Sequence, residues 1–121
     1  MSALSQLASR VFATRNAAHL LHWRTRSHAE HFALGKLYEA LPGGIDEIVE
    51  KHQGLNGLID DLDVKSIVID DVDAMIVHIS TERAWIQEHR QKIAGGSTTI
   101  ENLVDELMGH YCQALFDLQL S

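Results

Sequence analysis

The sequence has a single cysteine, Cys112, and a single proline, Pro42, among its 121 residues. One cysteine cannot form a disulfide within the chain, so a disulfide-stabilised fold is excluded and a reducing compartment is expected. No apolar run approaches roughly 18 residues and no segment has the pattern of a signal peptide, so neither a membrane span nor secretion is expected. We therefore predict one cytoplasmic domain over residues 1–121, with Cys112 as a small core residue.

Acidic residues are missing from the first 29 positions, which hold four arginines: Arg10, Arg15, Arg24 and Arg26. All seventeen acids follow from Glu30 onward, and the formal net charge is −7. Phosphates repel such a chain, so general DNA or RNA binding is not expected. We expect the basic first segment to pack beside acidic helices; a docking face for an acidic partner, including DNA, is the alternative.

Apolar residues recur at spacings of three and four between the few breaks in the chain, which is typical of amphipathic helices. The predicted helices cover about residues 3–26, 28–53, 71–94 and 98–119. Asp70 or Asp71 is expected to cap the third helix, and Thr98 with Glu101 to form a capping box for the fourth. The predicted fold is all-α: a ferritin-like up-down four-helix bundle with a crossover between helices 2 and 3.

Pro42 is followed by two glycines inside the second predicted helix, where such residues normally end a helix. One apolar phase nevertheless continues across them, through Leu34, Leu37, Leu41, Ile45, Ile48 and His52. A turn at this point would reset the phase. We therefore predict one kinked helix, with two short helices joined by a turn as the alternative.

Four of the eight histidines lie within residues 19–31: His19, His22, His28 and His31. Imidazoles with nearby carboxylates suit zinc, iron, copper or nickel. His22 falls within the apolar stripe of the first helix, where a polar side chain needs a partner; a hydrogen-bonded core histidine is the alternative to a metal ligand. His19 and His28 are expected at the helix surface.

Asp46 and Glu50 are the acids best placed to complete such a site, because their spacing of four puts both on one helix face. That face differs from the main apolar stripe, and Phe32 shares it, which indicates contact with another subunit. His31 and Asp46 lie about 22 Å apart along one helix and cannot share an ion. Two antiparallel copies of the helix could bring His31 opposite Asp46 and Glu50 of the other copy.

Other possible metal sites have less support in the sequence. The chain has no Glu-x-x-His pair, which a di-iron site inside one bundle would use. Residues 60–63 lack the glycine and the spacing of a calcium loop. Glu82 and His89 fall at the core edge, where ion pairing or capping is expected.

The series His22-Trp23, His31, Tyr38, Asp46 and Glu50 resembles the motif of Dps mini-ferritins, the DNA-protection-during-starvation proteins, over about residues 15–54. The resemblance implies a four-helix bundle with a short extra helix in the crossover and a ferroxidase site between two subunits. It makes His22 and His31 ligands from one chain and Asp46 and Glu50 ligands from its mate.

The same resemblance places Trp23 beside the iron and Tyr38 near the site, and His19, one helical step from His22, is expected near it as well. It also implies hydrogen peroxide as the oxidant and a hollow dodecamer. The segment from His22 to His31 is about three residues shorter than in that family, and the chain has no lysine-rich tail. The chain is also similar to short ferritin-like proteins encoded by bacteriophages.

The expected function is binding and oxidation of Fe(II), with zinc as a competitor for the same ligands, in a homo-oligomer that is at least a two-fold dimer. The alternative is a non-enzymatic helical structural or interaction protein, in which His22 and the acids form a polar network that fixes the dimer register. The same residues serve both functions, so the sequence does not separate them.

Overall fold

The structure, a computed structural model, describes residues 1–120, which form four helices and no strand. The helices are α1 (Ala3–Arg24), α2 (His28–Asn56), α3 (Val72–Ala94) and α4 (Thr98–Gln119). An all-helical fold is therefore confirmed. Compared with the predicted bounds, α1 ends two residues earlier, α2 ends three residues later and α3 begins one residue later.

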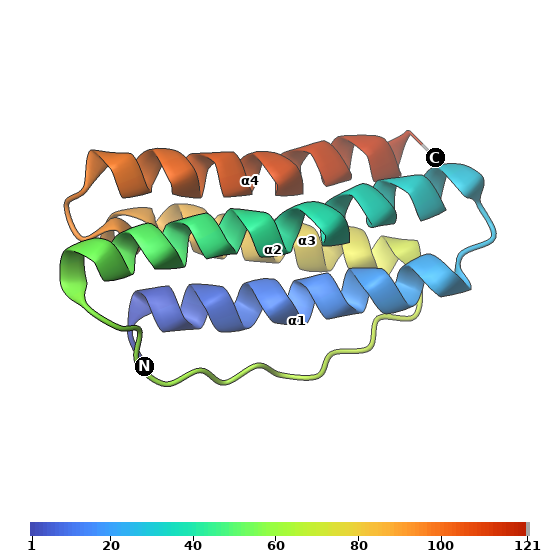
Figure 1. The fold of residues 1–121 in the computed structure, drawn as a ribbon. Coiled ribbons are helices and arrows are strands. Elements are labelled where there is room, and N and C mark those ends of the chain that lie inside the picture. Colours follow the sequence, from blue (N-terminus) through green and yellow to red (C-terminus); the bar gives the residue numbers. More distant parts are fainter. Residues whose placement is uncertain (121) are drawn as a thin grey trace.

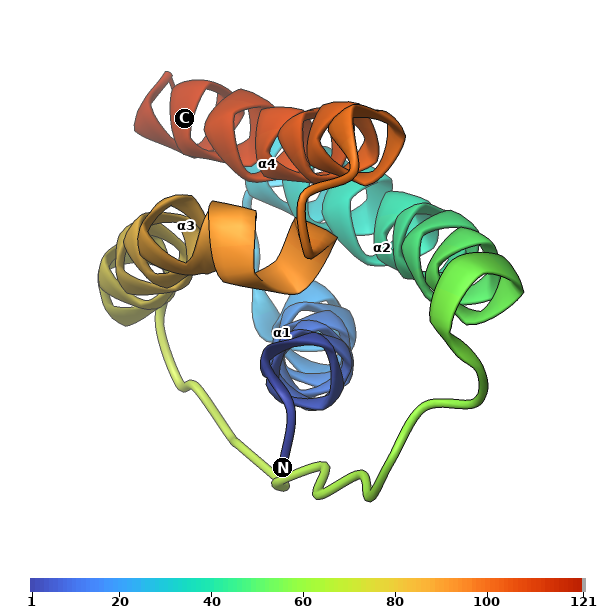
Figure 2. The same ribbon diagram turned by 90° about the vertical axis from the view of Figure 1, so that its left-hand side faces the viewer.

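The helices pack as a four-cornered bundle (Figure 2). α1 contacts α2 and α3, and α4 contacts the same two helices, so α1 and α4 lie on one diagonal and α2 and α3 on the other. α1 and α4 run in one direction, whereas α2 and α3 run in the other (Figure 1). Short connections join the antiparallel pairs α1–α2 and α3–α4. Residues 57–71 form a longer connection, which runs back along the bundle from the end of α2 to the start of α3.

The core consists of one apolar stripe from each helix. Its largest fully buried side chains are Leu7, Leu34, Leu37, Leu41, Ile45, Ile48, Met75, Ile79, Ile86, Ile93, Ile100 and Tyr111. These residues follow the predicted helical phases. Burial of apolar area on this scale, at about 25 cal/mol per Å², is the main favourable term in folding.

α2 continues without a break through Pro42. Leu41 and Ile45, on either side of the Pro-Gly-Gly sequence, are both buried in the core. Neither Gly43 nor Gly44 has a positive φ, so no tight turn forms there. The prediction of one long helix is confirmed, and the alternative of two short helices is wrong.

Side chains cap the start of each helix. Asp71 caps α3 by accepting a hydrogen bond from the Ala74 amide, as predicted. The predicted capping box of Thr98 and Glu101 is wrong by one residue: Ser97 is the N-cap of α4, and its Oγ accepts from the Ile100 amide at 3.2 Å. A serine in this position is as effective a cap as an aspartate.

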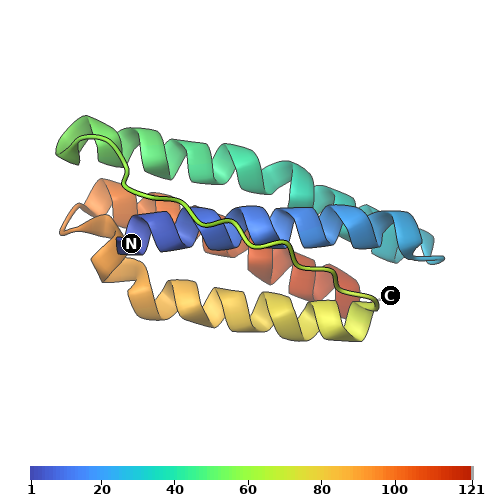
Figure 3. The same cartoon turned by 90° about the horizontal axis from the view of Figure 1, so that it is seen from below.

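Residues 57–71 are extended and contain no helix, so the short extra helix implied by the resemblance is absent from this connection. The segment runs along α1 (Figure 3). The Asp60 carboxylate accepts hydrogen bonds from the Ser2 amide and from the hydroxyls of Ser2 and Ser5, and the Asp63 amide donates to Ser9 Oγ. These bonds tie the connection to the first turns of α1.

Candidate metal centre

His22 and His31 lie next to each other where the end of α1 meets the start of α2. Their ring centroids are 3.8 Å apart and their planes are tilted by 41°. Nδ1 of His31 lies 2.8 Å from the carbonyl oxygen of His22. Only a protonated nitrogen donates to a carbonyl, so Nδ1 carries the hydrogen and Nε2 of neutral His31 holds the lone pair. The structure thus brings together the two histidines that the sequence singled out.

The two rings lie too close together to bind one ion in this arrangement. At metal–nitrogen distances of about 2.1 Å, two imidazoles on one ion have centroids roughly 4.5 Å or more apart. Within residues 1–120, no three His, Cys, Asp or Glu side chains are grouped so as to hold a metal ion. A ring of His22 or His31 has to rotate, and further ligands have to come from elsewhere, before an ion is held.

His22 has the electronic state that metal ligation requires. Burial lowers its pKa, and the neighbouring charges of His31 and His19 lower it further, against an opposing effect of Glu39. The imidazole is therefore neutral at pH 7, the form that binds metals. Its Nδ1 is buried and has no hydrogen-bond partner among the described residues, so a ligand there would satisfy an otherwise unpaired atom.

Three further aromatic rings lie close to the histidine pair. His19 stacks on Tyr38, with centroids 4.1 Å apart and planes 4° apart, and Tyr38 lies 5.1 Å from His22. Trp23 contacts His19 edge to face at 5.1 Å but remains 67% exposed. The stacking fixes His19 and Tyr38, whereas Trp23 projects from the bundle.

Asp46 and Glu50 lie farther along α2, well away from the histidine pair. Fifteen residues of continuous helix separate His31 from Asp46, about 22 Å along the axis. Both carboxylates are exposed, and neither makes a hydrogen bond or ion pair within residues 1–120. One chain does not assemble the four predicted ligands, and their meeting across two copies stays a prediction.

The unpaired acids belong to an exposed flank of α2 that neither α1 nor α4 covers. Its residues are spaced alternately four and three apart: Phe32, Lys36, Glu39, Gly43, Asp46 and Glu50. Phe32 is 61% exposed, so its side chain is accessible to another molecule. Its contact with a second subunit stays a prediction.

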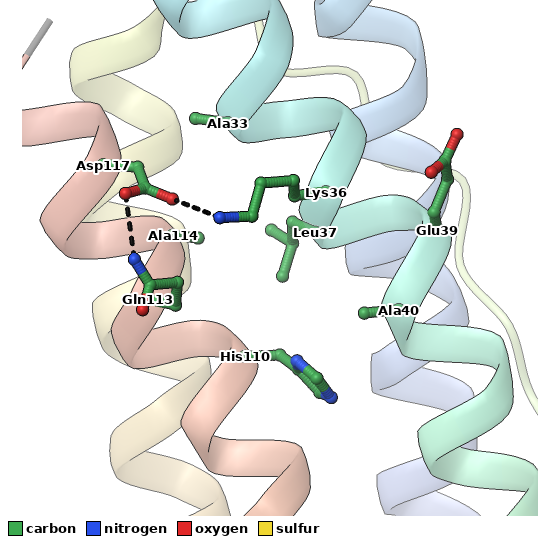
Figure 4. A pocket seen from close by; sticks show the side chains of 9 residues that line it. All are labelled: Ala33, Lys36, Leu37, Glu39, Ala40, His110, Gln113, Ala114 and Asp117. Carbon is green, nitrogen blue, oxygen red and sulfur yellow. Dashed lines mark hydrogen bonds and ion pairs between the residues drawn. The ribbon is translucent and has the colours of Figure 1, made fainter.

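Glu39 is a residue of this region that the sequence reading missed. A pocket of about 200 Å³ beside the histidine pair is lined by His22, His31, Lys36 and Glu39. On the opposite side of α2, a groove of about 390 Å³ lies against α4, where Lys36 and Asp117 approach within 3.4 Å. Figure 4 shows the Glu39 carboxylate turned away from Lys36. Glu39 lies on the same helix face as Phe32 and Glu50, and this shared face could have identified it from the sequence.

A second polar cluster lies between α1, α3 and α4. Glu82, which is buried, pairs with Arg10 at 2.9 Å, as expected for an acid at the core edge. The hydroxyl of Thr14 lies 2.9 Å from Nε2 of His78 and also hydrogen-bonds Tyr111. Burial lowers the pKa of His78 and raises that of Tyr111, so both stay neutral at pH 7. No pattern in the sequence predicts the Thr14–His78–Tyr111 contacts.

Two of the three arginines of α1 pair with acids. Arg10 pairs with Glu82 of α3, and Arg24 lies 2.8 Å from Asp70 of the connection, whereas Arg15 donates to the side chain of Asn16. The Arg10–Glu82 pair supports the expectation that the basic segment packs beside an acidic helix. Cys112 is exposed, so its predicted place in the core is wrong. No helix within residues 1–120 is long and apolar enough to cross a membrane.

No curated protein and no solved structure matches the chain. One family model matches residues 22–118, from the first histidine of the pair nearly to the end of α4. That range contains both histidines, the three acids of the exposed flank, the whole of α2 and α3, and all but the last residue of α4. Because the match covers well over half of the chain, the protein belongs to the family described as a family of unknown function (DUF5856).

Proposed function

We propose that the protein is a short mini-ferritin of the Dps type that binds Fe(II) and oxidises it to Fe(III) between two subunits. The observation that carries the proposal is the division of ligands along α2. His22 and His31 lie side by side at one end of α2, and unpaired Asp46 and Glu50 are exposed farther along the same unbroken helix. Two antiparallel copies of α2 supply both halves of a site, twice.

The ligand types suit this chemistry. Neutral imidazole is a borderline donor that binds Fe(II), whereas carboxylate is a hard donor that favours Fe(III). Asp46 and Glu50 therefore stabilise the product of oxidation more than its substrate. Hydrogen peroxide takes two electrons and two protons to give two waters, and two Fe(II) ions supply those electrons. The lone cysteine favours a reducing cytoplasm, in which iron is ferrous.

Anaerobic titration calorimetry with Fe(II) tests the binding half of the proposal. We expect one ion per chain, and His22→Ala should weaken binding by roughly tenfold or more. His110→Ala is the matched control, because His110 is an exposed histidine on α4. Equal binding by the two variants, or no binding by the wild type, would remove His22 from the site or remove the site itself.

A structural or interaction protein without metal chemistry is the second candidate. The observation in its favour is that the rings of His22 and His31 contact each other at 3.8 Å, with no group of three possible ligands among residues 1–120. In that case the histidines and Tyr38 only join α1 to α2. His31→Phe separates the two candidates: it should keep the ring contact and the thermal stability but abolish Fe(II) binding.

A further inference from the structure

The exposed flank of α2 contains a glycine that the contacts of one chain do not explain. A Cβ atom at Gly43 would meet nothing within 4 Å, and its φ is not positive. By contrast, a Cβ at Gly44 would lie 3.0 Å from Cδ1 of Leu107, so the close packing of α2 on α4 accounts for that residue. A glycine inside a helix costs about 0.5–1 kcal/mol relative to alanine. Gly43 carries this cost with no compensating contact in the described part of the chain.

The charges on the same flank are only partly compensated within one chain. Glu39 is exposed and makes no hydrogen bond or ion pair within residues 1–120. Lys36 is 3.4 Å from a carboxylate oxygen of Asp117, longer than the 2.7–2.9 Å typical of a charge-assisted bond. The Lys36 ammonium is largely exposed, so it can move to a better partner.

The proposed metal site fixes a register for two copies of α2, and the inference rests on that site. Placing His31 opposite the midpoint of Asp46 and Glu50 of a second copy puts the two-fold axis close to Glu39. In that register Gly43 faces Lys36 of the second copy, and Glu39 lies one helical turn, about 5.4 Å, from Gly43. Gly43, Lys36 and Glu39 thus all fall within about one helical turn of the axis.

We propose that two copies of α2 cross close to Glu39, with the aliphatic stem of Lys36 lying over Gly43 of the second copy and its ammonium pairing with Glu39 of that copy. The absence of a side chain at Gly43 lets the helices approach closely. The two-fold axis repeats the contact, so two lysines neutralise two glutamates that would otherwise repel. A second copy is the fitting occupant because the histidine pair lacks carboxylates that only another α2 supplies.

The first test replaces Gly43 with a large side chain. Gly109, an exposed helical glycine of α4 whose Cβ would also meet nothing within 4 Å, provides the matched control. Gly43→Leu and Gly109→Leu should both raise the unfolding temperature in chelator, because leucine is the better helix former. In sedimentation with Zn²⁺, a redox-inert probe, Gly43→Leu should weaken dimerisation by roughly tenfold or more, and Gly109→Leu should not.

The second test reverses the charges. Lys36→Glu and Glu39→Lys should each weaken the dimer, and the double variant should restore it, because the pair is then reformed with opposite signs. If the Zn²⁺-bound wild type dimerises no more strongly than Gly43→Leu, the proposed contact is wrong. It is also wrong if the double variant dimerises no more strongly than either single charge variant. Both outcomes leave the proposed function standing. A wild type that stays monomeric with Zn²⁺ overturns both the contact and the proposed function.

Discussion

Replacing Pro42 tests whether α2 is one helix. Pro42 lies inside α2, where it lacks the amide hydrogen that would bond the carbonyl of Tyr38, and its ring crowds that carbonyl. An interior proline costs about 3 kcal/mol relative to alanine, while alanine loses about 1 kcal/mol through the greater freedom of the unfolded chain. Pro42→Ala should therefore stabilise the fold by about 2 kcal/mol.

For a chain of this length, about 2 kcal/mol corresponds to a rise of about 8 °C in the unfolding temperature. Thermal circular dichroism in chelator measures it. Gly54→Ala calibrates the effect of helix propensity alone, because a Cβ at Gly54 would meet nothing within 4 Å and the gain should be about 1 kcal/mol or less. A Pro42→Ala variant that unfolds at a lower temperature than the wild type would refute the continuous helix and with it the separation of His31 from Asp46.

Three further predictions concern assembly, acid stability and the buried cluster. Phe32→Asp should sediment as a monomer, because an exposed aromatic ring on the flank becomes a charge; a fully dimeric variant would place the interface elsewhere. Hydrogen bonds from Ser5 and Ser2 lower the pKa of Asp60 to about 2, so their contribution to stability is full above its ordinary value of 3.8 and is lost as the pH falls through about 2. Asp60→Asn should lack that step in acid titrations followed by circular dichroism. Tyr111→Phe should lower the free energy of unfolding by about 1 kcal/mol in urea, because the buried Thr14 hydroxyl loses one partner; no change would mean that this bond contributes nothing.

The helices were predictable because each one repeats its apolar residues in a single phase. Leu41 and Ile45 kept that phase across the Pro-Gly-Gly sequence, and this outweighed the local signal for a turn. The ends were less predictable: Ser97 and Thr98 are both good caps, and only the backbone decides between them.

The extended connection was missed for a different reason. The resemblance implied a helix between α2 and α3, but residues 57–71 are fixed by contacts with a distant part of the chain. Asp60 bonds Ser2 and Ser5, and Ile67 packs against the core. No local pattern encodes such contacts.

The candidate site was predictable in part. The contact of His22 with His31 follows from a short connection between antiparallel helices. The tilt of the two rings, and the approach of Glu39 to the same pocket, depend on side-chain packing that spacing alone does not determine. The pairing of those histidines with Asp46 and Glu50 depends on a second chain and stays a prediction.

Iron oxidation by the double variant Asp46→Asn, Glu50→Gln tests the central proposal most directly. The substitutions preserve shape but remove the negative charge that stabilises Fe(III), so the rate should fall well below that of the wild type even where some Fe(II) still binds. Glu106→Gln provides a control, because Glu106 is an exposed acid on α4. The measurement is stopped-flow absorbance after apo-protein is mixed with Fe(II) and hydrogen peroxide. A wild type that oxidises iron faster than buffer, with the control unchanged and the double variant slow, is the predicted result; a wild type and double variant that both match buffer would contradict it.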